Sequence, residues 1–262
     1  MAKIDRQTAL RDARDDKKIP AAGALRPSPL TVAQCREALT ARADPAQAEH
    51  LSRFFRTGRG QYGEGDRFLG IKVPVTRAIA AQCGDTDPGL IAALLDDPYH
   101  EVRLLAGLLL ERTYRKHKAL RAEIVDIYLK NLPKFNNWDL VDLTCYGILG
   151  DWVSMRDRGV LYTLAASGNL WERRASIVST MALIRRGELD DTFALAEKLL
   201  DSPEDLMHKA VGWLLREAGK KDRARLDAFL GAHYPRIPRT ALRYAIEKHP
   251  EPERKAWLTR GK

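Results

Sequence analysis

The chain has 262 residues, of which 44 are Lys or Arg and 35 are Asp or Glu, so its formal net charge is +9. Hydrophobic residues make up 45% of the sequence and charged residues 30%, which is typical of a folded globular protein and excludes a wholly disordered one. The longest apolar run, 104–110, is far shorter than the roughly 18 residues of a membrane span, and the N-terminus lacks the apolar core of a secretory signal. We therefore expect neither a membrane protein nor a secreted one.

The cysteines and the charge indicate a compartment and a class of partner. Cys35, Cys83 and Cys145 are odd in number and far apart, which favours free thiols in a reducing cytoplasm over a disulfide framework. A basic protein in that compartment favours a polyanionic partner, most simply nucleic acid, although many basic proteins bind nothing acidic. For a bacterial protein this predicts a cytoplasmic location, at the nucleoid through DNA binding.

The predicted elements begin after an N-terminal tail. Residues 1–30 alternate in charge without an apolar stripe and contain three prolines, which predicts a mobile tail with a short helix within it. From Thr31 onward one helix follows another. A polar cap followed by a proline marks helix starts at 44–45, 87–88 and 97–98, the last of which opens a long helix to about residue 116. Sustained two-residue alternation is absent, so the sequence predicts an all-α domain over 31–262.

Four helical segments share a pattern in which small and aliphatic residues follow a basic residue. They read HEVRLLAGL, LWERRASIV, LMHKAVGWL and TALRYAIEK, and their aligned basic residues are Arg103, Arg174, Lys209 and Arg243. The separations are 71, 35 and 34, so the period is near 35 residues with one position skipped near Trp138. This period is in the range of HEAT-like and TPR-like repeats, and the TPR side-chain pattern is absent. We expect a right-handed α-solenoid of about six HEAT-like helix pairs or triples.

The repeat has a consequence for binding. Equivalent positions in stacked repeats project to the same side, so the four basic residues would line a basic concave face suited to the phosphates of a duplex. The alternative is that these residues pair with neighbouring acids, such as Glu101 or Glu172, on a solvated surface.

Other motifs carry no comparable signal. The segment GRGQYG at 58–63 matches the dinucleotide pattern GxGxxG, but its flanks are helical where that site needs a preceding strand, so it predicts a flexible loop. The six histidines show no metal-ligand spacing, and no GxSxG nucleophile motif is present. The sequence predicts no metal and no cofactor.

Aromatic and charged residues coincide in three helices. Trp138 and Asp142 are four residues apart and share a helix face. The next basic helix opens with tryptophan and two arginines, and Trp213 lies in a third helix with an arginine three residues on; these are Trp171, Arg173, Arg174 and Arg216. The alternative is that the tryptophans fill gaps between helix layers.

The segments FLGIKVP, NNWDLVD, GILGDW, LWERRASI and HKAVGWLLREAGKKD resemble, in order and spacing over 51–247, the AlkD-like DNA alkylation repair proteins, which are HEAT-like-repeat DNA glycosylases. In this resemblance Trp138 and Asp142 fall on the family's catalytic Trp and Asp. Arg174 falls on its active-site Arg, and Trp213 on its second active-site Trp. The N-terminal tail and the glycine-rich approach to FLGIKVP depart from the family pattern, which puts contacts from the first repeats in doubt.

The resemblance implies a monofunctional alkylpurine DNA glycosylase that hydrolyses the N-glycosidic bond of cationic N3- and N7-alkylated purines, such as 3-methyladenine and 7-methylguanine, in duplex DNA. Asp142 would stabilise the cationic sugar and orient the attacking water, while Trp138 and Trp213 would contact the deoxyribose. Arg174 would hold a backbone phosphate, and the lesion would stay in the duplex instead of being flipped. The expected further DNA contacts are Arg103, Arg173, Lys209, Arg216 and Arg243.

Two other functions fit the same architecture. A non-catalytic relative would bind distorted or branched DNA, and a protein-interaction scaffold would use the solenoid without DNA. Basic residues at repeat-equivalent positions argue against the scaffold. Asp142 argues against the pure DNA binder, because a carboxylate that faces phosphates costs affinity. We expect a monomer on duplex DNA.

Overall fold

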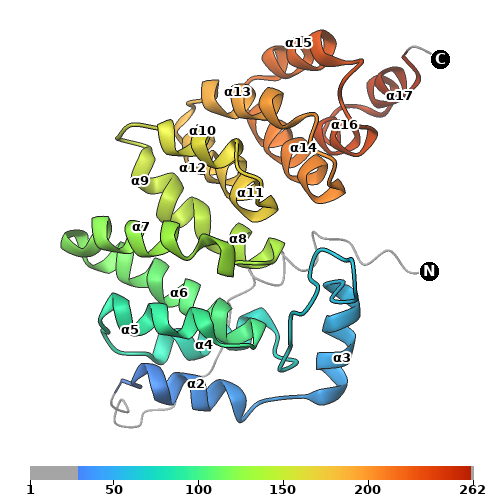
Figure 1. The fold of residues 1–262 in the computed structure, drawn as a ribbon. Coiled ribbons are helices and arrows are strands. Elements are labelled where there is room, and N and C mark those ends of the chain that lie inside the picture. The colour runs from blue at the N-terminus through green and yellow to red at the C-terminus, as the bar shows by residue number, and fades with distance from the viewer. Residues whose placement is uncertain (1–28, 261–262) are drawn as a thin grey trace. The chain divides into compact units, whose positions relative to one another are not determined.

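The computed structural model describes residues 29–260, and the regular secondary-structure elements of this part of the chain are helices (Figure 1). Two isolated parallel bridges, Leu30 with Cys83 and Arg67 with Tyr99, are the β contacts of this part of the chain. The all-α prediction is confirmed. The predicted tail over 1–30 lies outside the described residues except for its last two. No helix within 29–260 is both long and apolar enough to cross a bilayer.

The chain divides into two compact units, residues 1–113 and 114–262, with the boundary inside a long helix. The helices that begin in the first unit are α2 (Val32–Thr40), α3 (Pro45–Phe54), α4 (Val73–Gln82), α5 (Pro88–Ala93), the 3₁₀ turn η1 (Leu94–Asp96) and α6 (His100–Lys116).

The predicted helix starts of the first unit are largely confirmed. Thr31 caps α2 with a reciprocal capping box to Gln34, and the Asp44 side chain accepts from the Gln47 N–H at the start of α3. Asp87 caps α5 in the same way. α6 begins two residues after Pro98, and the Asp97 carboxylate before it accepts from the Tyr99 N–H at 3.0 Å and from Arg36 at 2.7 Å.

The second unit consists of helices that pack in two rows. Its elements are η2 (Lys118–Leu120), α7 (Arg121–Lys130), η3 (Leu132–Lys134), α8 (Trp138–Cys145), the π-helical η4 (Tyr146–Gly150), α9 (Asp151–Val153), α10 (Gly159–Ala165), α11 (Leu170–Ser179), α12 (Met181–Arg186), α13 (Asp190–Leu199), α14 (Asp205–Gly219), α15 (Arg223–His233), α16 (Arg239–Ala245) and α17 (Glu251–Thr259). α8 packs on α11, α11 on α14 and α14 on α16, while α10 packs on α13 beside them (Figure 1). This packing of successive helix pairs is that of a helical-repeat protein, as predicted.

The repeat is also visible in the register of α8, α11, α14 and α16, which we call the first row. The fifth residues of α8, α11, α14 and α16 are Asp142, Arg174, Lys209 and Arg243. The position that the sequence pattern skipped is therefore Asp142, which is an acid in a row of cations. Neighbouring helices come close in this row: a Cβ on Gly212 would lie 2.6 Å from the Cβ of Tyr244, so α14 and α16 cross where a side chain is missing.

Candidate active site

The N-terminus of α8 holds the first two site residues in a rigid setting. The fully buried Asn137 caps the helix, and its side-chain oxygen accepts from the Trp138 N–H at 2.9 Å. Trp138 and Asp142, one helical turn apart, are 8% and 7% exposed. Asp139, the adjacent acid, is buried as well. This part of α8 therefore lies in the packed interior, and Trp138 and Asp142 keep only a small exposed fraction.

Arg174 meets Asp142 in a two-pronged ion pair. From α11, its Nε donates to Oδ1 of Asp142 and its Nη2 donates to Oδ2, both at 2.7 Å. The third nitrogen, Nη1, donates to the backbone carbonyl of Leu206 at the start of α14, also at 2.7 Å. Arg174 is only 1% exposed. One guanidinium thus ties together α8, α11 and α14, and it fixes the plane in which the Asp142 carboxylate lies.

The thiol below Asp142 is not a nucleophile. Cys145 is fully buried in α8, and desolvation, reinforced by the nearby Asp142 carboxylate, raises the pKa of its thiol well above the ordinary value. A thiol that stays protonated does not attack a carbon centre at neutral pH. Cys145 is therefore a core residue of α8.

The remaining tryptophans lie on the neighbouring helices. Trp171, in the first turn of α11, is 7% exposed, and Trp213 on α14 is half-buried. Three helices that pack in succession, α8, α11 and α14, thus carry the four residues that the sequence predicts to be catalytic, Trp138, Asp142, Arg174 and Trp213.

The five residues predicted to contact DNA have different surroundings. Arg103, in the first unit, is 6% exposed and donates to Asp66 at 2.5 Å and to the Asp97 carbonyl at 2.9 Å. Arg103 therefore stabilises the interior of the first unit, and the structure does not support the predicted phosphate contact by Arg103.

The other four lie in the second unit, where three of them have acidic partners. Arg173 pairs with Glu204, Lys209 with Asp205, and Arg216 with Glu247 and Glu217. Arg243 is exposed, and none of the described acids pairs with it. Arg243 is thus the cation of this set that is most open to a phosphate.

Sequence reasoning missed the partners of these cations. Arg173 and Arg216 each meet an acid 31 positions further along the chain, and Arg174 meets Asp142 from 32 positions away. These separations are close to the repeat period. An acid about one repeat away from an arginine in the sequence was therefore the signal that could have predicted each ion pair.

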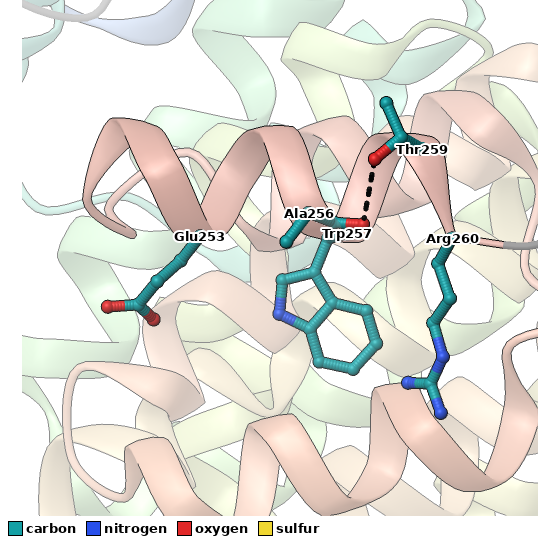
Figure 2. Close-up of a pocket in the computed structure, with 5 residues that line it drawn as sticks. All are labelled: Glu253, Ala256, Trp257, Thr259 and Arg260. Carbon is teal, nitrogen blue, oxygen red and sulfur yellow. Dashed lines mark hydrogen bonds between the residues drawn. The ribbon is translucent and has the colours of Figure 1, made fainter.

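A surface hollow of about 470 Å³ lies elsewhere in the second unit, along α17 (Figure 2). Its charged lining residues are already engaged, since Glu253 pairs with Arg223 and the Arg260 guanidinium lies 5.2 Å from the Trp257 ring centroid. Within 29–260, no group of three His, Cys, Asp or Glu residues is arranged to hold a metal ion. The hollow contains none of the predicted site residues.

Comparison with known proteins places the chain in a family. The family model described as "DNA alkylation repair enzyme" matches residues 35–249. A solved structure described as a predicted DNA alkylation repair enzyme from Enterococcus faecalis shares 19% sequence identity with a TM-score of 0.64, covering 80% of this chain and 97% of that one, and so supports the fold. No curated protein sequence matches. From the family match over most of its length, we conclude that the chain belongs to the DNA alkylation repair enzyme family.

Proposed function

We propose that this protein is a monofunctional DNA glycosylase that hydrolyses the N-glycosidic bond of cationic N3- and N7-alkylated purines in duplex DNA, the first step of base excision repair. The observation that carries the proposal is the Asp142 carboxylate, which is held by two hydrogen bonds from Arg174, lies one helical turn from Trp138 and belongs to a side chain that is 7% exposed. A stable fold gains little from such a buried pair compared with apolar residues, so its presence favours a role in chemistry. We expect the protein to act as a monomer in the cytoplasm, without metal or cofactor.

The reaction depends more on a group that stabilises positive charge on the sugar than on a general acid that protonates the leaving base. An N3- or N7-alkylated purine already carries a positive charge, so it leaves with the bonding electron pair of its glycosidic bond and becomes neutral. Cationic character then builds up on the sugar at C1′. Water adds to C1′, and its proton passes to Asp142 or to solvent. A carboxylate held beside C1′ stabilises the developing cation and orients the water.

The geometry of the ion pair supports this role for Asp142. Each carboxylate oxygen accepts two hydrogen bonds, and Arg174 occupies one position on each oxygen. In the proposed reaction, the attacking water would take one of the remaining positions. An unscreened unit charge pair at about 4 Å in an effective dielectric near 20 is worth about 4 kcal/mol, or about a thousandfold in rate, and pairing with Arg174 reduces this value.

The supporting residues have distinct parts in the proposal. Trp138, and Trp213 from α14, would present aromatic faces to a cationic lesion, worth about 0.5–2 kcal/mol for each contact. Arg174 acts as a positioning residue for Asp142, because its donors are directed inward instead of toward a phosphate. Arg243 and Lys209 would bind the phosphate backbone.

The test is single-turnover release of 7-methylguanine and 3-methyladenine from alkylated duplex DNA in the presence of a chelator. We expect release of the base at a rate that the chelator does not change, leaving an abasic strand that is not cut. Duplex binding without base release would contradict the proposal and favour the non-catalytic DNA binder.

A further inference from the structure

A cluster of arginines lies at the C-terminal ends of two helical runs whose N-terminal helices, α8 and α11, carry Asp142 and Arg174 of the proposed site. α8, η4 and α9 form one continuous helical run from Trp138 to Val153, and α11 is followed by α12, which ends at Arg186. At 1.5 Å per residue, the first run separates its two ends by about 22 Å. η4 packs on α12, so the C-terminal ends of both runs are neighbours. We call this area the arginine–aromatic surface; it consists of Tyr146, Trp152, Met155, Arg156, Arg185 and Arg186.

Two of its arginines are held on aromatic rings and have no acidic partner. The Arg156 guanidinium carbon lies 3.6 Å from the centroid of the Trp152 ring, and Arg156 also donates to the Trp152 carbonyl at 3.0 Å. The Arg185 guanidinium carbon lies 4.8 Å from the Tyr146 centroid. Both arginines are exposed, and none of the acids among residues 29–260 pairs with either. Because the rings hold these guanidiniums in place, less rotamer entropy is lost when they bind an anion.

An apolar side chain lies among these cations. Met155 is 72% exposed, more than the other large hydrophobic side chains of the described chain, and its Sδ is 3.0 Å from Nη2 of Arg186. Trp152 and Tyr146, whose rings hold Arg156 and Arg185, are half-buried. Trp, Tyr, Met and Arg are the residue types that are enriched in the centres of protein interfaces.

We propose that the arginine–aromatic surface docks an acidic peptide segment of another protein, with its carboxylates on Arg156 and Arg185 and an apolar side chain on Met155. The charges favour a peptide over DNA. Arg186 pairs with Glu188 at 2.8 Å, and the half-exposed Asp151 lies one residue before Trp152, so acids separate the free cations. Separated cations suit a peptide in which carboxylates alternate with apolar side chains better than they suit a continuous row of phosphates. A phosphate backbone would also gain nothing from an exposed methionine.

This surface shares no residue with the proposed active site. Docking there would bring a partner to the enzyme while the other end of the same helices engages DNA. The two proposals can therefore succeed or fail separately: loss of peptide binding in a variant of the surface is not expected to change base release.

The experiment uses the full chain and a fluorescently labelled peptide of alternating Asp and Leu, with binding followed by anisotropy. We expect the double variant Arg156→Ala/Arg185→Ala to bind this peptide at least about tenfold more weakly, the scale of about 1.4 kcal/mol. Arg254→Ala removes another exposed arginine, on α17, and is the matched control, expected to bind as the wild type does. Equal peptide binding by the double variant and the control would overturn the proposal.

Two further measurements separate the apolar contact and DNA. Met155→Ser should weaken binding of the Asp–Leu peptide several-fold but leave a peptide of alternating Asp and Ser unaffected. Labelled duplex DNA serves as the competing probe: if the double variant loses duplex affinity and keeps peptide affinity, the surface is a DNA contact and the proposal is wrong. Retained base release by the double variant would show that the proposed enzyme activity is independent of this surface.

Discussion

Arg174 and Asp142 meet in two parallel hydrogen bonds of 2.7 Å although 32 positions of sequence separate them. They occupy the same register position, the fifth residue, of adjacent helices α8 and α11. A repeat with one cation at this position in each helix would place like charges next to each other in the interior. The acid at position 142 instead gives its buried neighbour a counter-ion, and the same acid is the proposed catalytic group.

Asp142→Asn is expected to lower base release by about two to three orders of magnitude, because the amide keeps the size of the carboxylate and loses its charge. It also leaves Arg174 buried without its counter-ion, which should cost about 3–5 kcal/mol of stability. Single-turnover release and urea unfolding measure the two effects.

A double variant separates activity from stability. Asp142→Asn/Arg174→Gln removes both charges, so part of the lost stability should return while base release stays low. Asp126→Asn, an exposed acid on α7, is the control, since Asp139 is buried and unsuitable. Wild-type release by Asp142→Asn, or release regained by the double variant, would show that Asp142 is not the catalytic carboxylate.

Arg243→Ala should reduce the slope of log affinity against log salt by about one for duplex DNA, because an exposed cation would lose one phosphate contact. Lys209→Ala should act in the same direction if its ammonium exchanges Asp205 for a phosphate. Arg103→Ala should leave the slope unchanged and destabilise the protein, because Arg103 is buried against Asp66. If the salt slope is unaltered in both the Arg243 and the Lys209 variant, the prediction that these two residues bind DNA phosphates is wrong.

Asp66 should make stability depend on pH in acid. Desolvation opposes ionisation of this buried carboxyl, but hydrogen bonds and charge from His100 and Arg103 outweigh it and lower the pKa of Asp66 below its ordinary value of 3.8. A folded-state pKa below the unfolded one gives stabilisation that is fully present above about pH 4 and is lost as the pH falls through the folded value. At neutral pH, the wild type should therefore have a larger free energy of unfolding in urea than Asp66→Asn. This difference in unfolding free energy should narrow only below about pH 4. A gap of constant size down to strong acid would contradict this assignment.

Gly212→Ala tests the close crossing of α14 and α16. The added Cβ would lie 2.6 Å from the Cβ of Tyr244, so the helices must separate, at a cost of about 1–3 kcal/mol that exceeds the gain in helix propensity. Because Trp213 is the next residue, base release should fall as well. Gly168→Ala, where the added Cβ meets nothing within 4 Å, should unfold at the wild-type urea concentration. Equal unfolding midpoints for the two variants would mean that the crossing tolerates a side chain.

The sequence by itself determined the helices, their starts and the repeat. Caps such as Thr31 and Asp44, with Pro45 after it, act over three or four residues, so the signal for a helix start is local. The 35-residue spacing of the basic residues revealed the stacking, because equivalent positions of a repeat have equivalent surroundings. The resemblance then matched Trp138, Asp142, Arg174 and Trp213 to one site.

Only the tertiary structure decided what each charged side chain meets. Arg103 and Arg174 look like surface cations in the sequence, yet both are buried, against Asp66 and Asp142, whereas Arg243, at the same register position as Arg174, is exposed. A long side chain on a helix can extend into solvent or toward the neighbouring helix. The helix propensity of arginine does not distinguish these two orientations. The choice depends on whether the neighbouring helix presents an acid within hydrogen-bonding distance, which is settled only when the helices pack.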